Sequence, residues 1–225
     1  MIETTREGDV TVLAMRGGEN RFNPETLDEL EAALAGIEES EGAAALVITG
    51  EGKFFSNGLD LEWMGAAPEG AAQELAERVC RLLGRVLLFP HPTVAAINGH
   101  CFAAGAMLSL ACDARVMRAD RGFWCLPEAD INLPFTSGMS ALITARLSNR
   151  TAHEAMLGAR RYGGEEAFGA GIVERATTEG DVLDEAIAIA AAGAGRQAGT
   201  LAAIKRGMYS GVVEKLELPL PEQAT

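Results

Sequence analysis

The sequence predicts an α/β fold with a helical C-terminal part. In the first half of the chain, apolar runs of strand length alternate with helix-length segments, and after Pro134 short helical segments separated by glycine take over. A length of 225 residues with 48% apolar and 23% charged residues is typical of a globular protein with a well-buried core. We expect a main body over residues 1–192 and a helical tail over residues 193–225, joined at the glycine-rich stretch 193–199.

The N-terminal part predicts a strand–helix–strand unit. Val10–Met15 and Ala45–Thr49 are apolar runs of strand length, and the second lacks polar alternation, as a fully buried strand does. Between them, Pro24–Glu39 predicts a helix that Asn23 caps and that Pro24 begins. A strand, a helix and a second strand in this order favour parallel pairing. The predicted buried face of the helix carries Leu27, Leu30, Leu34 and Ile37.

The same order continues along the chain. Ala71–Phe89 has helical spacing of apolar residues and ends before the predicted strand Thr93–Asn98. A helix from about Ala104 to Cys112 and a strand over Ala114–Met117 follow. The C-terminal part predicts helices over residues 140–147, 151–157, 165–170 and 182–192, and one or two helices over residues 200–216.

Charge and cysteine content exclude several classes of protein. Asp and Glu number 32 against 19 Lys and Arg, a net charge of −13, which argues against nucleic acid or an anionic membrane as a partner. The longest weakly polar run, Val94–Ala111, contains polar residues and glycine and does not predict a membrane span. Four cysteines without CxxC spacing and three histidines argue against a metal site. The first ten residues have no apolar leader, so we expect a cytoplasmic protein.

The first segment with chemical potential is Gly52–Leu61, which follows a predicted buried strand. Ser56-Asn57-Gly58 is a turn signal, and a helix could start from Leu59, with Asp60 in its first turn. Two interpretations stay open. The glycine provides a positive φ in an ordinary loop, or it lets a ligand approach while the Leu59 N–H points into a site.

The second segment is Asn98–Leu110, where the small residues Ala103-Ala104-Gly105 stand at the start of a predicted helix. The free N–H groups at such a start can stabilise a developing oxyanion, although small residues also serve close helix–strand packing. The segment has neither the GxxxxGK[ST] pattern of a phosphate loop nor the GxGxxG pattern of a dinucleotide fold.

The third segment is Gly122–Pro134, which places Glu128 and Asp130 among apolar neighbours. Apolar surroundings raise the pKa of a carboxyl and make it a candidate proton shuttle. The alternative is that Glu128 is exposed at the end of a loop. We expect Asp130 to be structural, either pairing with a base or capping a turn; the alternative is a catalytic part.

Together, GKFFSNGLDL, PTVAAINGHCFAAGAMLSLACDARV and LPEADINLP resemble the enoyl-CoA hydratase/isomerase (crotonase) superfamily, and most of all its monofunctional Δ3,Δ2-enoyl-CoA isomerases. The resemblance implies a spiral of ββα units with C-terminal helices that assemble a homotrimer or a dimer of trimers. It also implies an acyl-CoA thioester substrate in fatty-acid metabolism, with coenzyme A as part of the substrate, no separate cofactor and no metal.

The resemblance also implies residue roles. The thioester oxygen would lie between the N–H groups of Leu59 and Ala104, and Glu128 would be the acid/base. Hydratases of this family have a second glutamate where this sequence has Met107. One carboxylate suffices for a 1,3-proton shift, so isomerisation is the expected reaction. The alternatives are another reaction of the family, such as enoyl-CoA hydration or acyl-CoA hydrolysis, or a non-catalytic acyl-CoA-binding protein. The positions implied to line the substrate site are Phe55, Ser56, Asn57, Gly58, Asp60, Ala103, Gly105 and Met107.

An anionic CoA ester on an acidic protein requires a local positive patch, and its binding should weaken at high salt. Lys205 and Arg206 in the tail could contact CoA phosphates or belong to a solvated helix face. Asp113 beside Arg115 predicts a structural ion pair.

Overall fold

A computed structural model describes residues 1–39 and 44–220. Its larger sheet has six strands in the order β1-β2-β3-β5-β7-β9. The hairpin β1–β2 is antiparallel, and every other pair is parallel, including β2 with β3 as predicted. Strands β1 and β9 are absent from the prediction because β1 is largely polar and β9 is only three residues long. The strands are β1 (Ile2–Glu7), β2 (Val10–Met15), β3 (Ala45–Gly50), β5 (Thr93–Ile97), β7 (Ala114–Arg118) and β9 (Arg175–Thr177).

A second, three-stranded sheet lies where the sequence predicts only turns and loops. Its strands β4 (Phe54–Ser56), β6 (His100–Phe102) and β8 (Trp124–Cys125) pair in parallel in the order β4-β6-β8. Each is two or three residues long, too short to show a periodic pattern. Tyr162 extends the β8 edge through an antiparallel bridge to Trp124.

Helix α1 (Pro24–Glu38) begins as predicted. The Asn23 side chain accepts a hydrogen bond from the Thr26 N–H at 3.0 Å. The acidic surface of α1 is partly neutralised by α3 (Ala71–Leu87), because Arg78 and Arg85 form ion pairs with acidic side chains of α1. All four predicted core residues of α1, Leu27, Leu30, Leu34 and Ile37, are buried.

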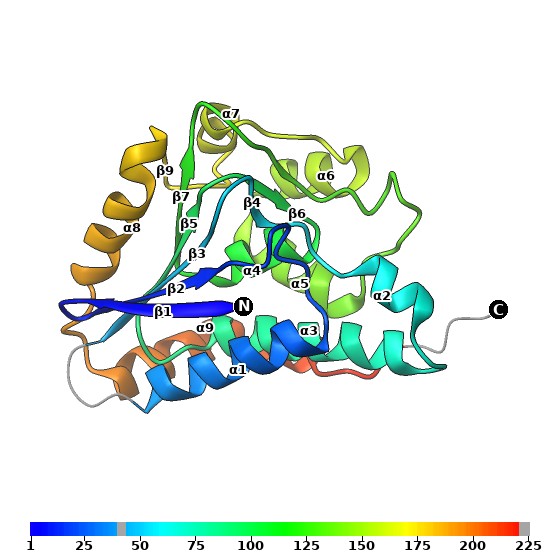
Figure 1. Cartoon of the computed structure of the whole chain (residues 1–225), viewed down its shortest axis with the longest axis horizontal. Helices are drawn as coiled ribbons and strands as arrows, with labels where there is room; N and C mark the ends of the chain where they lie inside the picture. Colours follow the sequence, from blue (N-terminus) through cyan, green and yellow to red (C-terminus); the bar gives the residue numbers. More distant parts are fainter. Residues whose placement is uncertain (40–43, 221–225) are drawn as a thin grey trace.

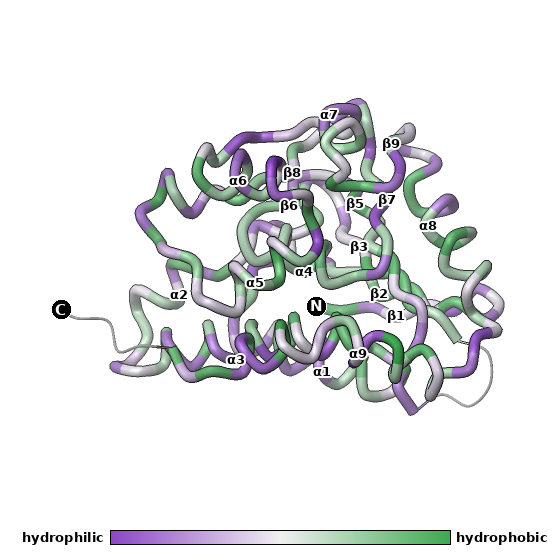
Figure 2. Tube along the Cα trace, turned by 180° about the vertical axis from the view of Figure 1, so that it is seen from behind, coloured by the Kyte–Doolittle hydropathy of each residue, from purple (hydrophilic) through white to green (hydrophobic). Residues whose placement is uncertain are grey.

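Two hydrophobic layers enclose the six-stranded sheet (Figure 1). Helix α8 (Val182–Ala191) covers one face, where its apolar side chains meet valines and alanines of the strands. The other face packs against α1, α3 and α4 (Ala104–Ala111), and all eight residues of α4 are buried. In Figure 2, α3 alternates between hydrophilic and hydrophobic colours, as expected of an amphipathic helix between core and solvent.

The C-terminal part is helical, as predicted. The last helix, α9 (Ala198–Leu216), is continuous and packs on α3 and α5 (Ser137–Arg146). A Cβ built onto Gly138 of α5 would lie 2.5 Å from the Leu216 Cα, so the two helices touch through backbone. In the described ranges no helix has both the length and the apolar character needed to cross a membrane. The remaining helices are α2 (Leu61–Ala66), α5 (Ser137–Arg146), α6 (Asn149–Gly158), α7 (Gly164–Gly169) and α9 (Ala198–Leu216), with a 3-10 turn at Glu179–Asp181.

Candidate active site

The small sheet brings the three predicted segments together. Strand β4 leads to Leu59, β6 leads to Ala104, and β8 leads to Glu128. The strands are parallel and hydrogen-bonded, for example from the Ala103 N–H to the Cys125 carbonyl at 3.1 Å. Their carboxyl ends therefore meet at one edge, which is where open parallel sheets bind ligands.

Two glycines allow this edge to close. Gly58 has φ +80°, and a Cβ built on it would lie 2.8 Å from the Ala103 Cβ and 3.1 Å from the Ala104 nitrogen. A Cβ on Gly105 would lie 2.7 Å from the carbonyl oxygen of Ser56. Any larger residue at either position would force the two segments apart. Glycine is thus needed here both for the turn and for the close approach.

The Leu59 N–H is oriented by pairing with the chain before α1. The Phe22 N–H donates to the Gly58 carbonyl at 2.8 Å, and the Asp60 N–H donates to the Phe22 carbonyl at 3.0 Å. In extended backbone successive groups alternate in direction, so the Leu59 N–H points away from Phe22. Among the described residues it has no hydrogen-bond acceptor.

The Ala104 N–H is the first of helix α4 and has no intrahelical acceptor. The residue before it, Ala103, has φ +50° and ψ −124°, a strained conformation for a residue with a Cβ, and offers no side-chain cap. This strained turn directs the helix start, with its positive dipole end, toward the same edge.

Glu128 is buried, with 4% of its surface exposed, in a turn closed by hydrogen bonds from Asp130 and Ile131 to the Pro127 carbonyl. Its Oε2 has no hydrogen-bond partner in the described part of the chain. Burial raises the pKa of Glu128 to about 7, although a hydrogen bond from its own backbone N–H acts in the opposite direction. The prediction of a carboxyl in apolar surroundings is confirmed, and such a group can both accept and return a proton near neutral pH.

Several side chains predicted to line the substrate site instead stabilise the turn around Gly58 through hydrogen bonds. Ser56 Oγ donates to the Asn20 carbonyl at 2.7 Å, and Asn57 Nδ2 donates to Glu19 Oε2 at 2.9 Å. Asp60 accepts a hydrogen bond from the Trp63 N–H at 3.1 Å and therefore caps α2, which starts at Leu61, instead of lying in its first turn. Asn20, which is not among the predicted site residues, donates its Nδ2 to the Phe54 and Phe55 carbonyls at 3.1 and 3.0 Å. Its only signal in the sequence is its place before the predicted helix.

The other implied positions lie in the same small-sheet region. Phe55 belongs to β4, with its ring fully buried. Met107 is buried in α4 and donates its N–H to the Ala103 carbonyl at 3.0 Å. Asp130 is exposed, and its carboxylate makes no hydrogen bond or ion pair with the described residues, so the expectation that it pairs or caps is wrong.

The structure gives Lys205 and Asp113 other partners than the sequence predicts. Lys205 is buried and forms an ion pair with Asp113 at 2.7 Å, which removes it from the candidates for phosphate contact. Asp113 therefore pairs with Lys205 and not with Arg115, whose partner is Glu174. The residues concerned are far apart in sequence, and no local pattern identifies such partners.

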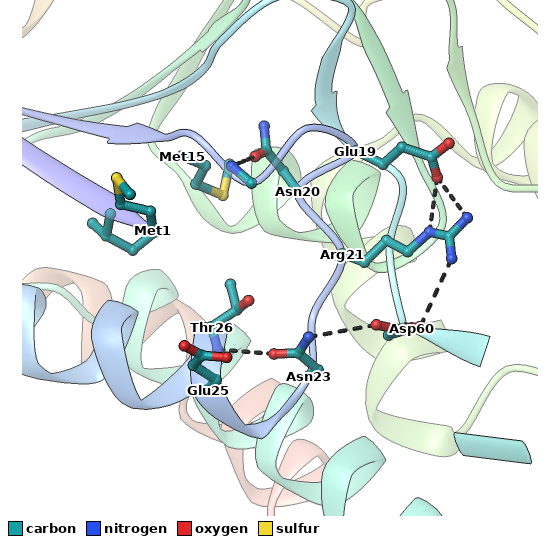
Figure 3. A pocket seen from close by; sticks show the side chains of 11 residues that line it. Met1, Met15, Glu19, Asn20, Arg21, Asn23, Glu25, Thr26 and Asp60 are labelled. Atoms are coloured by element: carbon teal, nitrogen blue, oxygen red, sulfur yellow. Dashed lines mark hydrogen bonds and ion pairs between the residues drawn. The ribbon is translucent and has the colours of Figure 1, made fainter. Parts of the chain in front are cut away.

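A polar cavity of about 400 Å³ adjoins the Asp60 turn (Figure 3). Arg21 stands at one end, held by Glu19 at 2.7 Å and within 3.8 Å of Asp60. Neither Glu128, Leu59 nor Ala104 lines it, so it lies beside the candidate catalytic groups; Asp60 is the predicted substrate-lining position that borders it. Its lining residues are Met1, Ile2, Met15, Gly17, Glu19, Asn20, Arg21, Asn23, Glu25, Thr26 and Asp60.

Nearly the whole chain matches one family of known proteins. The family described as Enoyl-CoA hydratase/isomerase matches residues 6–224. The chain belongs to this family. The resemblance of the three motifs is thereby confirmed.

Members of the enoyl-CoA hydratase/isomerase family with curated names include two from Arabidopsis thaliana. Enoyl-CoA delta isomerase 3 is 38% identical over 182 residues, which cover 78% of this chain and 76% of the relative. Enoyl-CoA delta isomerase 2, peroxisomal, is 38% identical over 189 residues, which cover 80% of this chain and 79% of the relative.

Solved structures of the same family confirm the predicted crotonase fold. An enoyl-CoA isomerase of Mycobacterium tuberculosis superposes with a TM-score of 0.88 at 27% identity, covering 96% of this chain and 93% of that one. An enoyl-CoA hydratase of Bacillus anthracis superposes with a TM-score of 0.85 at 25% identity, covering 94% of this chain and 83% of that one. Isomerases and hydratases thus share this fold, and the fold alone does not separate the two reactions.

Proposed function

We propose that the protein is an enoyl-CoA isomerase that moves the double bond of a 3-enoyl-CoA to the 2-trans position. The observation that carries the proposal is the buried Glu128 carboxyl, with a pKa near 7, at the sheet edge that also presents the Leu59 and Ala104 N–H groups. The names of the Arabidopsis thaliana relatives support it.

The reaction proceeds by a 1,3-proton transfer. The Glu128 carboxylate takes a proton from C2 of the 3-enoyl thioester, and the electron pair moves onto the thioester oxygen to form a dienolate. The Leu59 and Ala104 N–H groups donate hydrogen bonds to that oxygen as its charge develops. The carboxyl then returns its proton at C4, the double bond shifts to C2–C3, and Glu128 is again a carboxylate.

Met107 distinguishes isomerisation from hydration. Addition of water requires one group to activate the water and another to protonate the substrate, and methionine can do neither. Its apolar side chain, with 1% of the residue exposed, also helps to exclude water from the proton-transfer path. Hydration is the first alternative because hydratases share the fold. A non-catalytic acyl-CoA-binding protein is the second.

Several expectations accompany the proposal. The substrate is an acyl-CoA thioester, with coenzyme A as its carrier and no further cofactor or metal. The implied substrate-lining positions around Gly58 and Gly105 and the trimer or dimer of trimers remain predictions. The cytoplasmic location also remains a prediction, and one Arabidopsis thaliana relative carries the word peroxisomal in its name.

Incubation of the purified protein with a 3-enoyl-CoA and, separately, with a 2-enoyl-CoA tests the proposal. We expect conjugated enoyl thioester from the first substrate and no 3-hydroxyacyl product from the second. Glu128→Gln should reduce the isomerase rate by about 10²–10⁴-fold, the usual range for loss of a general acid/base. Asp130→Asn, which changes an exposed carboxylate in the same loop, is the matched control and should stay close to wild type.

Two results would contradict the proposal. Hydration of the 2-enoyl-CoA without isomerisation would favour the hydratase. Binding of both thioesters without turnover of either would favour the non-catalytic protein.

A further inference from the structure

The outer face of the small sheet carries a cluster of aromatic side chains that the proposed reaction does not use. Side chains alternate along each strand, so Cys101 and Trp124 point into the core, where both are fully buried. Phe54 and Phe102 point outward on either side of His100, with ring centres 5.3 and 5.1 Å from the His100 ring. The aromatic platform defined here consists of Phe54, His100, Phe102 and Phe123.

Three cations surround the aromatic platform. Lys53 Nζ lies 5.5 Å from the Phe54 ring centre, and the Arg161 guanidinium lies 5.9 Å from that of Phe102. Arg121 is near enough to His100 for its charge to lower the pKa of that histidine, as Lys53 and Arg161 also do. All three cations are exposed. They come from three separate segments of the chain and converge only in the fold.

Within the described ranges these cations form no ion pair, and the acids that their charges reach, Glu19 and Asp120, are already paired with other arginines. Arg78, Arg85 and Arg118 each form ion pairs at 2.8 Å or less. Lys53, Arg121 and Arg161 form none with the residues the structure describes. On a chain with a net charge of −13, three unpaired cations around one cluster make a local positive site.

The environment of His100, at the centre of the aromatic platform, disfavours the charged form of its imidazole. Burial, followed by the charges of Lys53, Arg121 and Arg161, lowers the pKa of His100. Its Nδ1 is buried without a partner among the described residues. Phe123, at 40% exposure, is the most accessible ring. Apolar rings beneath a cation also reduce its contact with water, which strengthens its attraction for an anion.

We propose that the aromatic platform binds a ligand that joins a flat ring to phosphate, namely a purine nucleotide. The ring stacks on Phe123 and His100, and the phosphates contact Lys53, Arg121 and Arg161. The site is distinct from the catalytic edge, because it uses the face of the small sheet and not its carboxyl end. The proposal does not depend on the isomerase assignment, and the ligand is a free nucleotide and not the nucleotide end of the acyl-CoA substrate.

Calorimetric titration of the full chain with ADP tests the proposal, with adenosine and inorganic pyrophosphate as ring-only and phosphate-only probes. We expect ADP to bind more tightly than either probe and to bind more weakly as salt increases. Phe123→Ala should weaken ADP binding by about tenfold, the effect of losing one stacking ring. Arg121→Gln should weaken both ADP and pyrophosphate and leave adenosine unchanged.

Matched controls and an acyl-CoA titration complete the test. Phe168→Ala removes an exposed phenylalanine of α7, and Arg81→Gln removes an exposed cation of α3; both should bind ADP as wild type does. Thermal unfolding verifies that each variant is folded. Calorimetric titration with an acyl-CoA should give the same Kd for Phe123→Ala as for the wild type. A Kd that rises in parallel with the Kd for ADP would assign the nucleotide to the substrate and overturn the proposal.

Three further results would also overturn the proposal. ADP does not bind, or it binds Phe123→Ala and Arg121→Gln as tightly as wild type. The third is tighter binding of a single-stranded oligonucleotide than of ADP through the same residues, which makes the platform a nucleic-acid surface.

Discussion

The six-stranded and three-stranded sheets both use parallel pairing, but they differ in length, burial and polar contacts. Strands β3 and β5 of the larger sheet are five or six residues long and are covered on both faces. The strands of the small sheet are two or three residues long, with one buried face and one partly open aromatic face. Even so, every residue of the candidate acid/base and oxyanion groups follows a strand of the small sheet.

Polar groups show the same contrast. Next to the larger sheet, buried Arg115 pairs with Glu174, and buried Lys205 pairs with Asp113. His91, just before β5, is an exception, because its Nε2 has no hydrogen-bond partner within residues 1–39 and 44–220. At the small sheet, one oxygen of the Glu128 carboxyl likewise has no partner in those ranges. The paired charges of the larger sheet fit a structural role, and the small sheet holds the candidate groups of the proposed reaction, one of them with a raised pKa.

Of the changes that compare the small-sheet edge with the rest of the molecule, the largest expected effect on rate is at Gly58. Gly52, which also has a positive φ, is its control. Gly58→Ala should lower kcat by about 10²–10³-fold, the cost of losing one oxyanion donor, because its Cβ would push Leu59 away from Ala104. Gly52→Ala introduces similar backbone strain at φ +71°, but its Cβ meets nothing within 4 Å. It should lose stability and keep its kcat. Equal rate losses in the two variants, measured by the isomerase assay on folded protein, would remove the special role of the small-sheet edge.

A large-to-small substitution in the larger sheet should have the opposite effect, lowering stability and leaving the rate unchanged. Leu46 is fully buried in β3, and Leu46→Ala should lower the free energy of unfolding by about 2–5 kcal/mol. Urea unfolding measures this loss, and the isomerase rate of the remaining folded protein should be close to wild type. Thr4→Ala, at an exposed position of β1, is the control with little effect on either measurement. A large loss of kcat in folded Leu46→Ala would show that the two sheets do not divide stability and chemistry.

The raised pKa of Glu128 predicts a pH-dependent cost in stability. The folded protein keeps this proton up to about pH 7, whereas an unfolded glutamate loses it near 4.5. The contribution of Glu128 to the free energy of unfolding is therefore fully present below pH 4.5, where the group is protonated in both states. It is lost as the pH rises through 7, because the folded state then also has to bury the charge. Relative to Glu128→Gln, the wild type should lose about 3 kcal/mol over this range.

Urea unfolding of both proteins from pH 4 to pH 8 measures the difference, in which the other titrating groups cancel. The same proton should give the isomerase kcat/KM an acidic limb near pH 7, because the reaction starts from the carboxylate. A stability difference that stays constant with pH would mean that burial does not shift Glu128.

The smallest expected effect concerns salt. The acidic body and the few unpaired cations predict that the KM for an acyl-CoA rises a few-fold between low and high salt, as screening of exposed charge pairs requires. The kcat should stay unchanged, because the buried Glu128 and the backbone donors are screened less. Steady-state kinetics at several salt concentrations distinguish the two. A salt-dependent kcat with constant KM would place the screened charges at the catalytic edge instead.

The fold could be predicted from sequence where local pattern is strong. Helix α1 with its Asn23 cap and the buried strands β2 and β3 lie where the apolar spacing places them. The small sheet could not be predicted, because strands of two or three residues have no readable period and their pairing joins distant segments. The candidate site could be predicted from the sequence only in part. Glycines, small residues and a glutamate in an apolar segment gave the positions, and the family resemblance gave their roles.

The sequence by itself determined the local helices and longer strands, the family and the chemical identity of the candidate groups. Only the tertiary structure decided that Gly58 touches Ala103, that Glu128 is buried with a raised pKa, and that Lys205 pairs with Asp113, 92 positions away. The physical reason is that propensity and periodicity act over a few residues, whereas desolvation and ion pairing depend on which distant segments fold against one another.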